Sequence, residues 1–306
     1  MTDASATAPL PGIAPSRSVA GDIWRQFRAH RGGLAGLFVF VFIVLAVYVG
    51  PYIHQVAPNT INVRERNQWP SWAHPFGTDN LGKDMLAQVL AGGRISLAVG
   101  ITAMLLALLL GTLVGVLSGY FRRLDGPLMR MTDLFLALPL LPLLLVILML
   151  FRDTLRSAFG PETGIFILIV FVIGITSWMH TARIVRGDVL AVKSQEFIVA
   201  AKSSGMREHR IIIRHVLPNV LSSIMVSATL GIASAIITES ALSFLGLGFP
   251  SDFPTWGRLL YDGANFMQLT PSRVLWPGLA ISLTVLSVNF MGDAIRDALD
   301  PRALKR

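Results

Sequence analysis

Six long apolar stretches constrain the fold of this chain more than any other feature of its sequence. Each approaches the ~20 apolar residues that an α-helix needs to cross a bilayer. We place these spans at Leu34–Tyr52, Ile95–Tyr120, Met131–Leu150, Gly164–Thr181, Val220–Leu247 and Val274–Ile295. Charged residues make up 14% of the chain, whereas soluble globular domains carry about 25%. The sequence therefore predicts an all-α, polytopic membrane protein with six transmembrane helices.

The basic residues predict how these spans are oriented. With the N-terminus inside, 18 of the 26 Lys and Arg residues lie on the inner side of the spans and eight on the outer side. Cytoplasmic segments carry an excess of Lys and Arg, so both termini are predicted to be cytoplasmic. The net charge of +8 is then mostly a topology signal, and nucleic acid is not an expected partner. The apolar run from Leu34 exceeds the core of a signal peptide and predicts an uncleaved anchor.

This topology divides the chain into four parts. Residues 1–33 form a cytoplasmic N-terminal tail, of which the first twenty are predicted to be disordered. Residues 34–94 hold the first transmembrane helix and a long extracytoplasmic loop. Residues 95–295 form a five-helix core that contains a polar cytoplasmic loop at 182–219, and residues 296–306 form a cytoplasmic C-terminal tail. Within the third span, Pro139 and Pro142 are expected to bend or loosen the helix.

The cytoplasmic loop interrupts the apolar pattern with the basic segment EFIVAAKSSGMREHRIIIRHVLPN, residues 196–219. A short helix is predicted from Ser194 to Ser204, ended by Gly205 in the left-handed conformation that glycine adopts at low cost. A second short helix follows, and Pro218 suits the first turn of the next span. The small residues of the first helix allow another protein to approach closely, which favours docking over chemistry. A hairpin that merely connects two spans is the alternative.

The same loop resembles the cytoplasmic motif of ABC importer permeases. That motif is Glu-Ala-Ala-x-x-x-Gly, followed further on by a hydrophobic residue, any residue, Leu and Pro. The strings VAAKSSG at 199–205 and HVLP at 215–218 match it at Ala200, Ala201, Gly205, Leu217 and Pro218. They depart from it at Val199, which stands at the glutamate position, and at His215, which stands at the isoleucine position. Glu196 lies three residues before Val199.

The resemblance extends over nearly the whole chain, from Asp22 to Arg302. Three further strings look like the C-type permease subunit of dipeptide/oligopeptide ABC importers, a binding-protein-dependent transport system inner-membrane component. They are FGTDNLGKDMLAQVLAGGRISLAVG at 76–100, ESALSFLGLGFP at 239–250 and NFMGDAIRDALDPR at 289–302. The resemblance implies the type I ABC importer permease fold in the lipid bilayer of a bacterial inner membrane. It also implies a heterodimer with a second homologous permease subunit, each forming half of the pathway.

Further partners and substrates follow from the same resemblance. Two ATPase subunits would dock below, and an extracytoplasmic substrate-binding protein would deliver the solute. The residues expected to dock an ATPase subunit are Glu196, Val199, Ala200, Ala201, Gly205, Leu217 and Pro218. Di- and oligopeptides are the expected substrates, while nickel chelates, haem or other small solutes stay open because selectivity lies largely in the binding protein.

Nucleotide chemistry is expected to lie outside this chain. Its sequence contains no G-x-x-x-x-G-K-[ST] phosphate loop. ATP and Mg would therefore be bound by the ATPase subunits. The chain itself is expected to be a non-catalytic permease with no cofactor and no catalytic residue.

Three polar residues in the spans are candidates for the translocation pathway or gate, because such residues are costly in a bilayer. Asp133 lies within i, i+3 reach of Arg130, so a helix-end ion pair is the alternative to a gate. Glu239 is expected to face the partner permease or the cavity, for packing, gating or substrate contact. Asn289 is expected to hydrogen-bond between helices rather than bind a ligand.

The sequence disfavours other classes of membrane protein. Its six histidines do not cluster, and it has no cysteine, so no metal site is predicted. A secondary transporter would show internal repeats and broken spans, and we find no repeat. A membrane enzyme would gather carboxylates or metal ligands at one interface, and a channel would contain a filter-like segment. Neither feature is evident.

Overall fold

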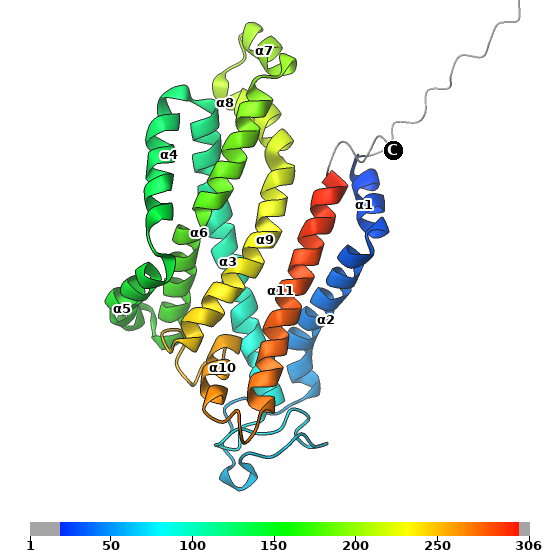
Figure 1. Cartoon of the computed structure of the whole chain (residues 1–306), viewed down its shortest axis with the longest axis vertical. Coiled ribbons are helices and arrows are strands. Elements are labelled where there is room, and N and C mark those ends of the chain that lie inside the picture. The colour runs from blue at the N-terminus through cyan, green and yellow to red at the C-terminus, as the bar shows by residue number, and fades with distance from the viewer. Residues whose placement is uncertain (1–18, 300–306) are drawn as a thin grey trace, which may run out of the picture.

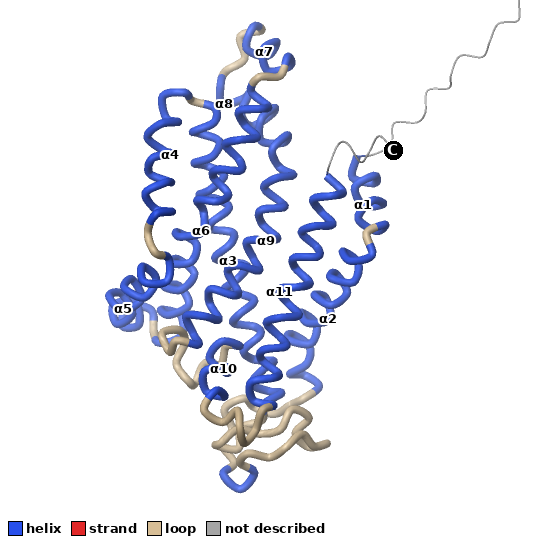
Figure 2. The backbone as a smooth tube through the Cα atoms, viewed as in Figure 1, coloured by secondary structure: helices blue, strands red, loops and turns tan. Residues whose placement is uncertain are grey.

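The computed structural model describes residues 19–299. Within these residues the chain is helical, and it contains no strand beyond one isolated bridge between Thr78 and Asp84. Residues 1–18, which belong to the stretch predicted to be disordered, lie outside the described residues. The C-terminal residues 300–306 lie outside them too. The helices, shown in Figure 1 and Figure 2, are α1 (Val19–Ala29), α2 (Arg31–Ile53), α3 (Met85–Tyr120), α4 (Arg122–Ala137), α5 (Leu140–Phe159), α6 (Pro161–Lys193), α7 (Glu196–Ser203), α8 (Glu208–Ile211), α9 (Leu217–Phe244), α10 (Trp256–Ala264) and α11 (Ser272–Leu299).

Five helical segments are long and apolar enough to cross a membrane. They are Arg31–Ile53, Met85–Tyr120, Pro161–Lys193, Glu208–Phe244 and Ser272–Leu299. The third predicted span, Met131–Leu150, is not one continuous helix, and if it is counted with its bend as one span the number of candidate spans is six. The structure replaces it with α4 and α5, which meet at 87°. Proline lacks an N–H and pushes the preceding residue out of the helical region, so Leu138 and Pro139 break the helix, as Pro139 predicted.

The second span begins earlier than predicted, at Met85 rather than Ile95. Asp84 accepts a hydrogen bond from Ala87 N and so caps the first turn. Apolar patterning alone missed this turn because Gln88 and Arg94 interrupt it. Arg94 donates to the carbonyls of Val47 and Tyr48 at 3.1 Å and ties α3 to α2.

Helix α3 runs through the bundle and packs most extensively against α6. A glycine row on α3, Gly111, Gly115 and Gly119, lets the two backbones approach closely. A Cβ atom at Gly115 would lie 2.8 Å from the Ala182 carbonyl, and one at Gly111 would lie 2.7 Å from the Trp178 carbonyl. Small residues at a spacing of four are a common device for helix association in membranes.

The two ends of the bundle differ in structure. The α7–α8 hairpin, α1 and the end of α11 lie at one end, and the irregular segment 54–84 and α10 lie at the other (Figure 1, Figure 2). At the first end, Phe27 of α1 packs against Ala294 and Ala298 of α11. The predicted N-terminal tail is thus helical from Val19 onward.

Candidate functional site

The predicted docking hairpin is anchored to the bundle by one face of α7. Ile198 and Ala201 are buried, and they pack with Val189 of α6, Ile211 of α8 and Val216. Burial of apolar side chains is the main force that fixes such a short helix, because eight residues are too few to be stable alone. The hairpin therefore has a fixed position relative to α6.

The opposite face of α7 is exposed. Glu196, Val199, Ala200 and Ser203 lie along it, and the Val199 side chain is 56% exposed. These residues occupy one side of the helix because they are three or four positions apart. The face combines small and apolar side chains with one carboxylate, and it projects beyond the ends of the long helices (Figure 1).

Gly205 ends α7 as predicted. Its φ of +78° lies in the left-handed region that favours glycine. Gly205 N donates to the Lys202 carbonyl at 3.0 Å, and Met206 N donates to the Ala201 carbonyl at 3.2 Å. This pair of bonds is a Schellman cap. The cap turns the chain toward α8, and the carbonyls in the last turn of α7 keep hydrogen-bond donors.

The second half of the hairpin continues directly into α9. Helix α8, a π-helical turn at Ile212–Val216 and α9 form one helical segment, Glu208–Phe244. Pro218 lies in the first turn of α9, directly after the π-helical turn and Leu217. Asn219 Nδ2 donates to the His215 carbonyl at 2.7 Å. The hairpin is therefore continuous with α9.

Basic residues tie the hairpin and α6 to neighbouring helices. Lys193 donates to the Tyr120 carbonyl at the end of α3, and the ammonium groups of Lys193 and Lys202 both lie over the Tyr120 ring. Cation–π contacts of this kind contribute about 0.5–1 kcal/mol at exposed sites. Arg186 of α6 makes two contacts to the carboxylate of Asp125 on α4.

A cavity of about 790 Å³ lies between α6, α9, α3 and the end of α11. Its volume falls within the range of small-molecule sites. Hydroxyl side chains dominate its polar lining, and they come from two helices: Thr176, Ser177 and Thr181 of α6, and Ser222, Ser223, Ser227, Ser234 and Thr238 of α9. Helix α9 thus connects the hairpin to the cavity wall.

Glu239 lies inside the subunit, fully buried, and not on a free face. Its carboxylate accepts hydrogen bonds from Ser96 Oγ of α3 at 3.0 Å and from Ser243 Oγ of α9 at 2.7 Å. Ser96 Oγ also accepts from the backbone N–H of Trp256, the first residue of α10. The carboxylate therefore links three helices at the end of the bundle that carries α10.

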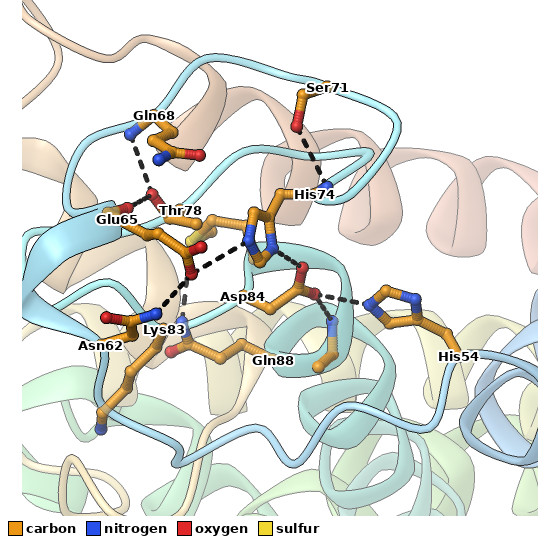
Figure 3. A network of polar contacts seen from close by, with 12 residues as sticks. His54, Asn62, Glu65, Gln68, Ser71, His74, Thr78, Lys83, Asp84 and Gln88 are labelled. Carbon is orange, nitrogen blue, oxygen red and sulfur yellow. Dashed lines mark hydrogen bonds and ion pairs between the residues drawn. The ribbon is translucent and has the colours of Figure 1, made fainter.

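A second polar network fixes the segment 54–84 at the same end (Figure 3). The buried Asp84 carboxylate lies between two imidazoles, with His54 Nε2 at 3.0 Å and His74 Nδ1 at 2.7 Å. Because an ionised carboxylate only accepts hydrogen bonds, both imidazoles donate to it. His74 Nε2 lies 3.5 Å from Glu65 Oε2. This outer clamp, formed by His54, Glu65, His74 and Asp84, joins the end of α2 to the start of α3.

Comparisons with known proteins identify the family. A family model described as "Binding-protein-dependent transport system inner membrane component" matches residues 107–305. This chain belongs to that permease family. A second model, described as the N-terminal TM domain of oligopeptide transport permease C, matches residues 18–70 of the permease.

Named relatives resemble the permease over most of its length. It is 42% identical over 290 residues to the oligopeptide transport system permease protein OppC of Escherichia coli K12, which covers 94% of this chain and 92% of the relative. It is 37% identical over 290 residues to the dipeptide transport system permease protein DppC of Bacillus subtilis, which covers 94% and 87%.

A solved structure supports the fold. The inward-facing MetNI methionine ABC transporter matches with a TM-score of 0.55 at 17% identity, over 71% of this chain and 98% of that chain. The predicted ABC importer permease fold of a multi-pass membrane protein is thereby confirmed.

The structure places the permease's three polar candidates in different surroundings. Asp133 pairs with Arg183 of α6 rather than with Arg130, because α4 lies beside α6. Glu239 was expected at the cavity or the partner surface, and it is buried among α3, α9 and α10. Asn289 is half-buried on α11. None of the three lines the cavity.

The structure also corrects the prediction that the histidines do not cluster, since His54 and His74 share Asp84. They are far apart in the sequence, and only folding of the segment 54–84 brings them together. Among residues 19–299, no group of three or more His, Cys, Asp or Glu side chains has the geometry of a metal site.

The cavity hydroxyls were missed by the sequence analysis. The spacing of Ser223, Ser227, Ser234 and Thr238 along one helical face was the available signal. Of the residues predicted to dock an ATPase subunit, Glu196, Val199, Ala200, Gly205 and Pro218 are exposed at the hairpin, Leu217 is half-buried and Ala201 is buried.

Proposed function

We propose that this permease forms half of the translocation pathway of an ATP-driven importer of dipeptides or oligopeptides. The names of the relatives in Escherichia coli and Bacillus subtilis support peptides as the substrate class. A second homologous permease would complete the pathway as a heterodimer. An extracytoplasmic binding protein would deliver the peptide, which agrees with the description of the family.

One observation carries the proposed coupling to ATP hydrolysis. The α7–α8 hairpin is anchored on one face, exposed on the other, and continuous through Glu208–Phe244 with the wall of the cavity. An ATPase subunit that binds the exposed face would therefore move α9 when the ATPase pair closes. This is a hinge-like coupling between two sites. ATP and Mg would be bound by the ATPase subunits, and the permease would contribute contacts and no catalysis.

We further propose that the hairpin, α1 and both termini lie in the cytoplasm. The hairpin, α1 and the end of α11 share one end of the bundle (Figure 1), and the excess of basic residues on that side supports this orientation. The segment 54–84 and α10 would then face the binding protein. The tail 1–33, the part 34–94, the core 95–295 with its coupling loop 182–219, and the tail 296–306 remain our proposed division of the chain.

The first experiment is affinity purification of the tagged permease from native membranes in mild detergent, with co-purifying proteins identified by mass. We expect a second permease and ATPase subunits. The variant Val199→Arg should lose the ATPase subunits, because it puts a bulky charge on the exposed face of α7, and should keep the second permease. Leu269→Arg is the matched control, since Leu269 is also apolar, is 67% exposed and lies far from α7 in the sequence, between α10 and α11.

Two results would contradict the proposal at different levels. Retention of the ATPase subunits by Val199→Arg would show that the exposed face of α7 is not the docking surface. Purification of the wild-type chain alone and intact, with uptake unaffected by ATP depletion, would overturn the importer assignment. Nickel chelates, haem or another solute in place of peptides would be revealed by uptake with the co-encoded binding protein.

A further inference from the structure

The hydroxyls of α9 form a line along the cavity. Ser223, Ser227, Ser234 and Thr238 all line it, and Gly231 continues the row between them. Successive residues of an α-helix advance by about 100°, so these four side chains fall within an arc of about 60°. At about 1.5 Å per residue the line is about 22 Å long. Thr176, Ser177 and Thr181 of α6 line the same cavity. We call these seven residues the hydroxyl wall.

The hydroxyl wall carries no permanent charge. Among the cavity residues contributed by α6 and α9, His180 is the one titratable side chain, and the others are hydroxyls, glycine or apolar groups. Arg296 and Asp297 contact the cavity only from the end of α11. A solute in this half of the cavity therefore meets groups that both donate and accept hydrogen bonds, with no fixed preference for the sign of its charge.

Ser227 differs from buried hydroxyls such as those of Thr176 and Ser287. In an apolar helix a Ser or Thr hydroxyl commonly donates to a carbonyl of its own preceding turn. Thr176 donates in this way to the Val172 carbonyl at 2.8 Å, and Ser287 to the Thr284 carbonyl at 2.8 Å. Ser227 is only 8% exposed, and its Oγ has no hydrogen-bond partner among residues 19–299. Ser227 is one of the residues that line the cavity, and its buried hydroxyl has its bonding capacity unused.

We propose that the hydroxyl wall binds the main chain of the transported peptide, with Ser227 as its central contact. This inference rests on the proposed function and assigns the recognition of the peptide backbone to this subunit. A peptide main chain alternates N–H donors and carbonyl acceptors, and a hydroxyl serves either. An extended peptide advances about 3.3 Å per residue, so the line on α9 matches about six residues. Because the main chain is common to all peptides, such contacts would allow the hydroxyl wall to bind peptides with different side chains.

The test uses the complete importer, with both permeases, the ATPase subunits and the binding protein, reconstituted in liposomes. The probes are trialanine and its ester analogue, in which oxygen replaces the N–H of one of the two amides. A hydrogen bond of ordinary strength corresponds to about a fivefold change in rate or affinity. We expect Ser227→Ala to lower trialanine uptake by about that factor and to lower ester uptake less. The ratio of the two uptakes, compared between variant and wild type, cancels any preference of the binding protein.

Two further variants separate binding from folding. Ser227→Thr keeps the hydroxyl and should retain most of the trialanine uptake. Ser287→Ala removes an equally buried hydroxyl that is already satisfied within α11, away from the cavity, and should leave uptake unchanged. Co-purification of the ATPase subunits with each variant shows that the complex is assembled.

The outcomes distinguish this inference from the proposed function. If assembled Ser227→Ala takes up both probes in the wild-type ratio and at wild-type rates, the hydroxyl wall does not bind the main chain, while the importer assignment stands. If the assembled wild-type importer takes up no trialanine, the peptide substrate itself is wrong. Equal loss of both probes in Ser227→Ala and Ser227→Thr would also overturn the inference, because it would indicate a packing defect.

Discussion

The guanidinium of Arg186 on α6 donates two parallel hydrogen bonds to the carboxylate of Asp125 on α4. They run from Nε to Oδ1 and from Nη2 to Oδ2, the second at 2.8 Å. The geometry is the bidentate fork that only arginine offers. This ion pair joins α4 to α6 at the end of the bundle that carries the hairpin. Both side chains are about one-third exposed, so solvent weakens the pair.

We predict that Arg186→Lys loses most of this contribution, because lysine cannot make the fork. A double-mutant cycle with Asp125→Ala should give a coupling free energy of about 1 kcal/mol, measured by thermal unfolding in detergent. The pair Arg183–Asp133, which makes one contact and is more exposed, is the comparison and should give less. A larger coupling for the second pair would contradict the argument.

The α3–α6 interface predicts opposite effects for two glycines. Gly115→Ala should destabilise the permease by about 1–3 kcal/mol, since a Cβ atom there would lie 2.8 Å from the Ala182 carbonyl and from Val185 Cβ. Gly187→Ala on α6 has no atom within 4 Å and should be neutral or stabilising by up to about 1 kcal/mol, because alanine is the better helix former. Thermal midpoints of the two purified variants test the sign of each effect.

The buried carboxylate of Glu239 is predicted to act through its hydrogen bonds. Glu239→Gln keeps the shape and a partner for Ser96 and Ser243, whereas Glu239→Leu leaves both hydroxyls without an acceptor. The leucine variant should lose about 1–3 kcal/mol of stability relative to the glutamine variant. A cysteine pair that reports the distance between α3 and α10 should cross-link less efficiently in the leucine variant. Equal behaviour of the two variants would indicate that the hydrogen bonds contribute nothing.

The outer clamp is predicted to protect the segment 54–84 from proteolysis. Asp84→Asn replaces one acceptor oxygen with an NH₂ group that faces an imidazole donor, so either His54 or His74 loses its partner. We expect faster cleavage within this segment and a cost of about 1–2 kcal/mol from the lost hydrogen bond. Asp153→Asn, at an exposed aspartate of α5, is the control and should be cleaved at the wild-type rate.

Several elements of the fold were predictable because their causes are local. The break at Pro139 follows from the missing N–H of proline. The turn at Gly205 follows from a single glycine after a short helix, and its φ of +78° agrees. The start of α3 was missed for a local reason too, because the polar side chains of its first turns interrupt the apolar pattern that defined the span.

The site was less predictable, since its contacts join distant parts of the sequence. Ser96 and Glu239 are 143 residues apart, and Arg183 and Asp133 are 50 apart. Spacing along one helix predicted an ion pair between Arg130 and Asp133. In the structure Asp133 pairs instead with Arg183 of the neighbouring helix α6. The same limitation hid the pairing of His54 and His74 with Asp84.

The sequence by itself determined that this chain is a bundle of membrane-spanning helices with one short helical hairpin between two of them. Long apolar runs have few alternatives in a bilayer, where the backbone must satisfy its own hydrogen bonds, and the hairpin signals lie within one short segment. Only the tertiary structure decided which polar residues face the cavity and which are buried between helices. That choice depends on the rotation and packing of each helix against the others, which the glycine row on α3 and the bend between α4 and α5 fix in three dimensions.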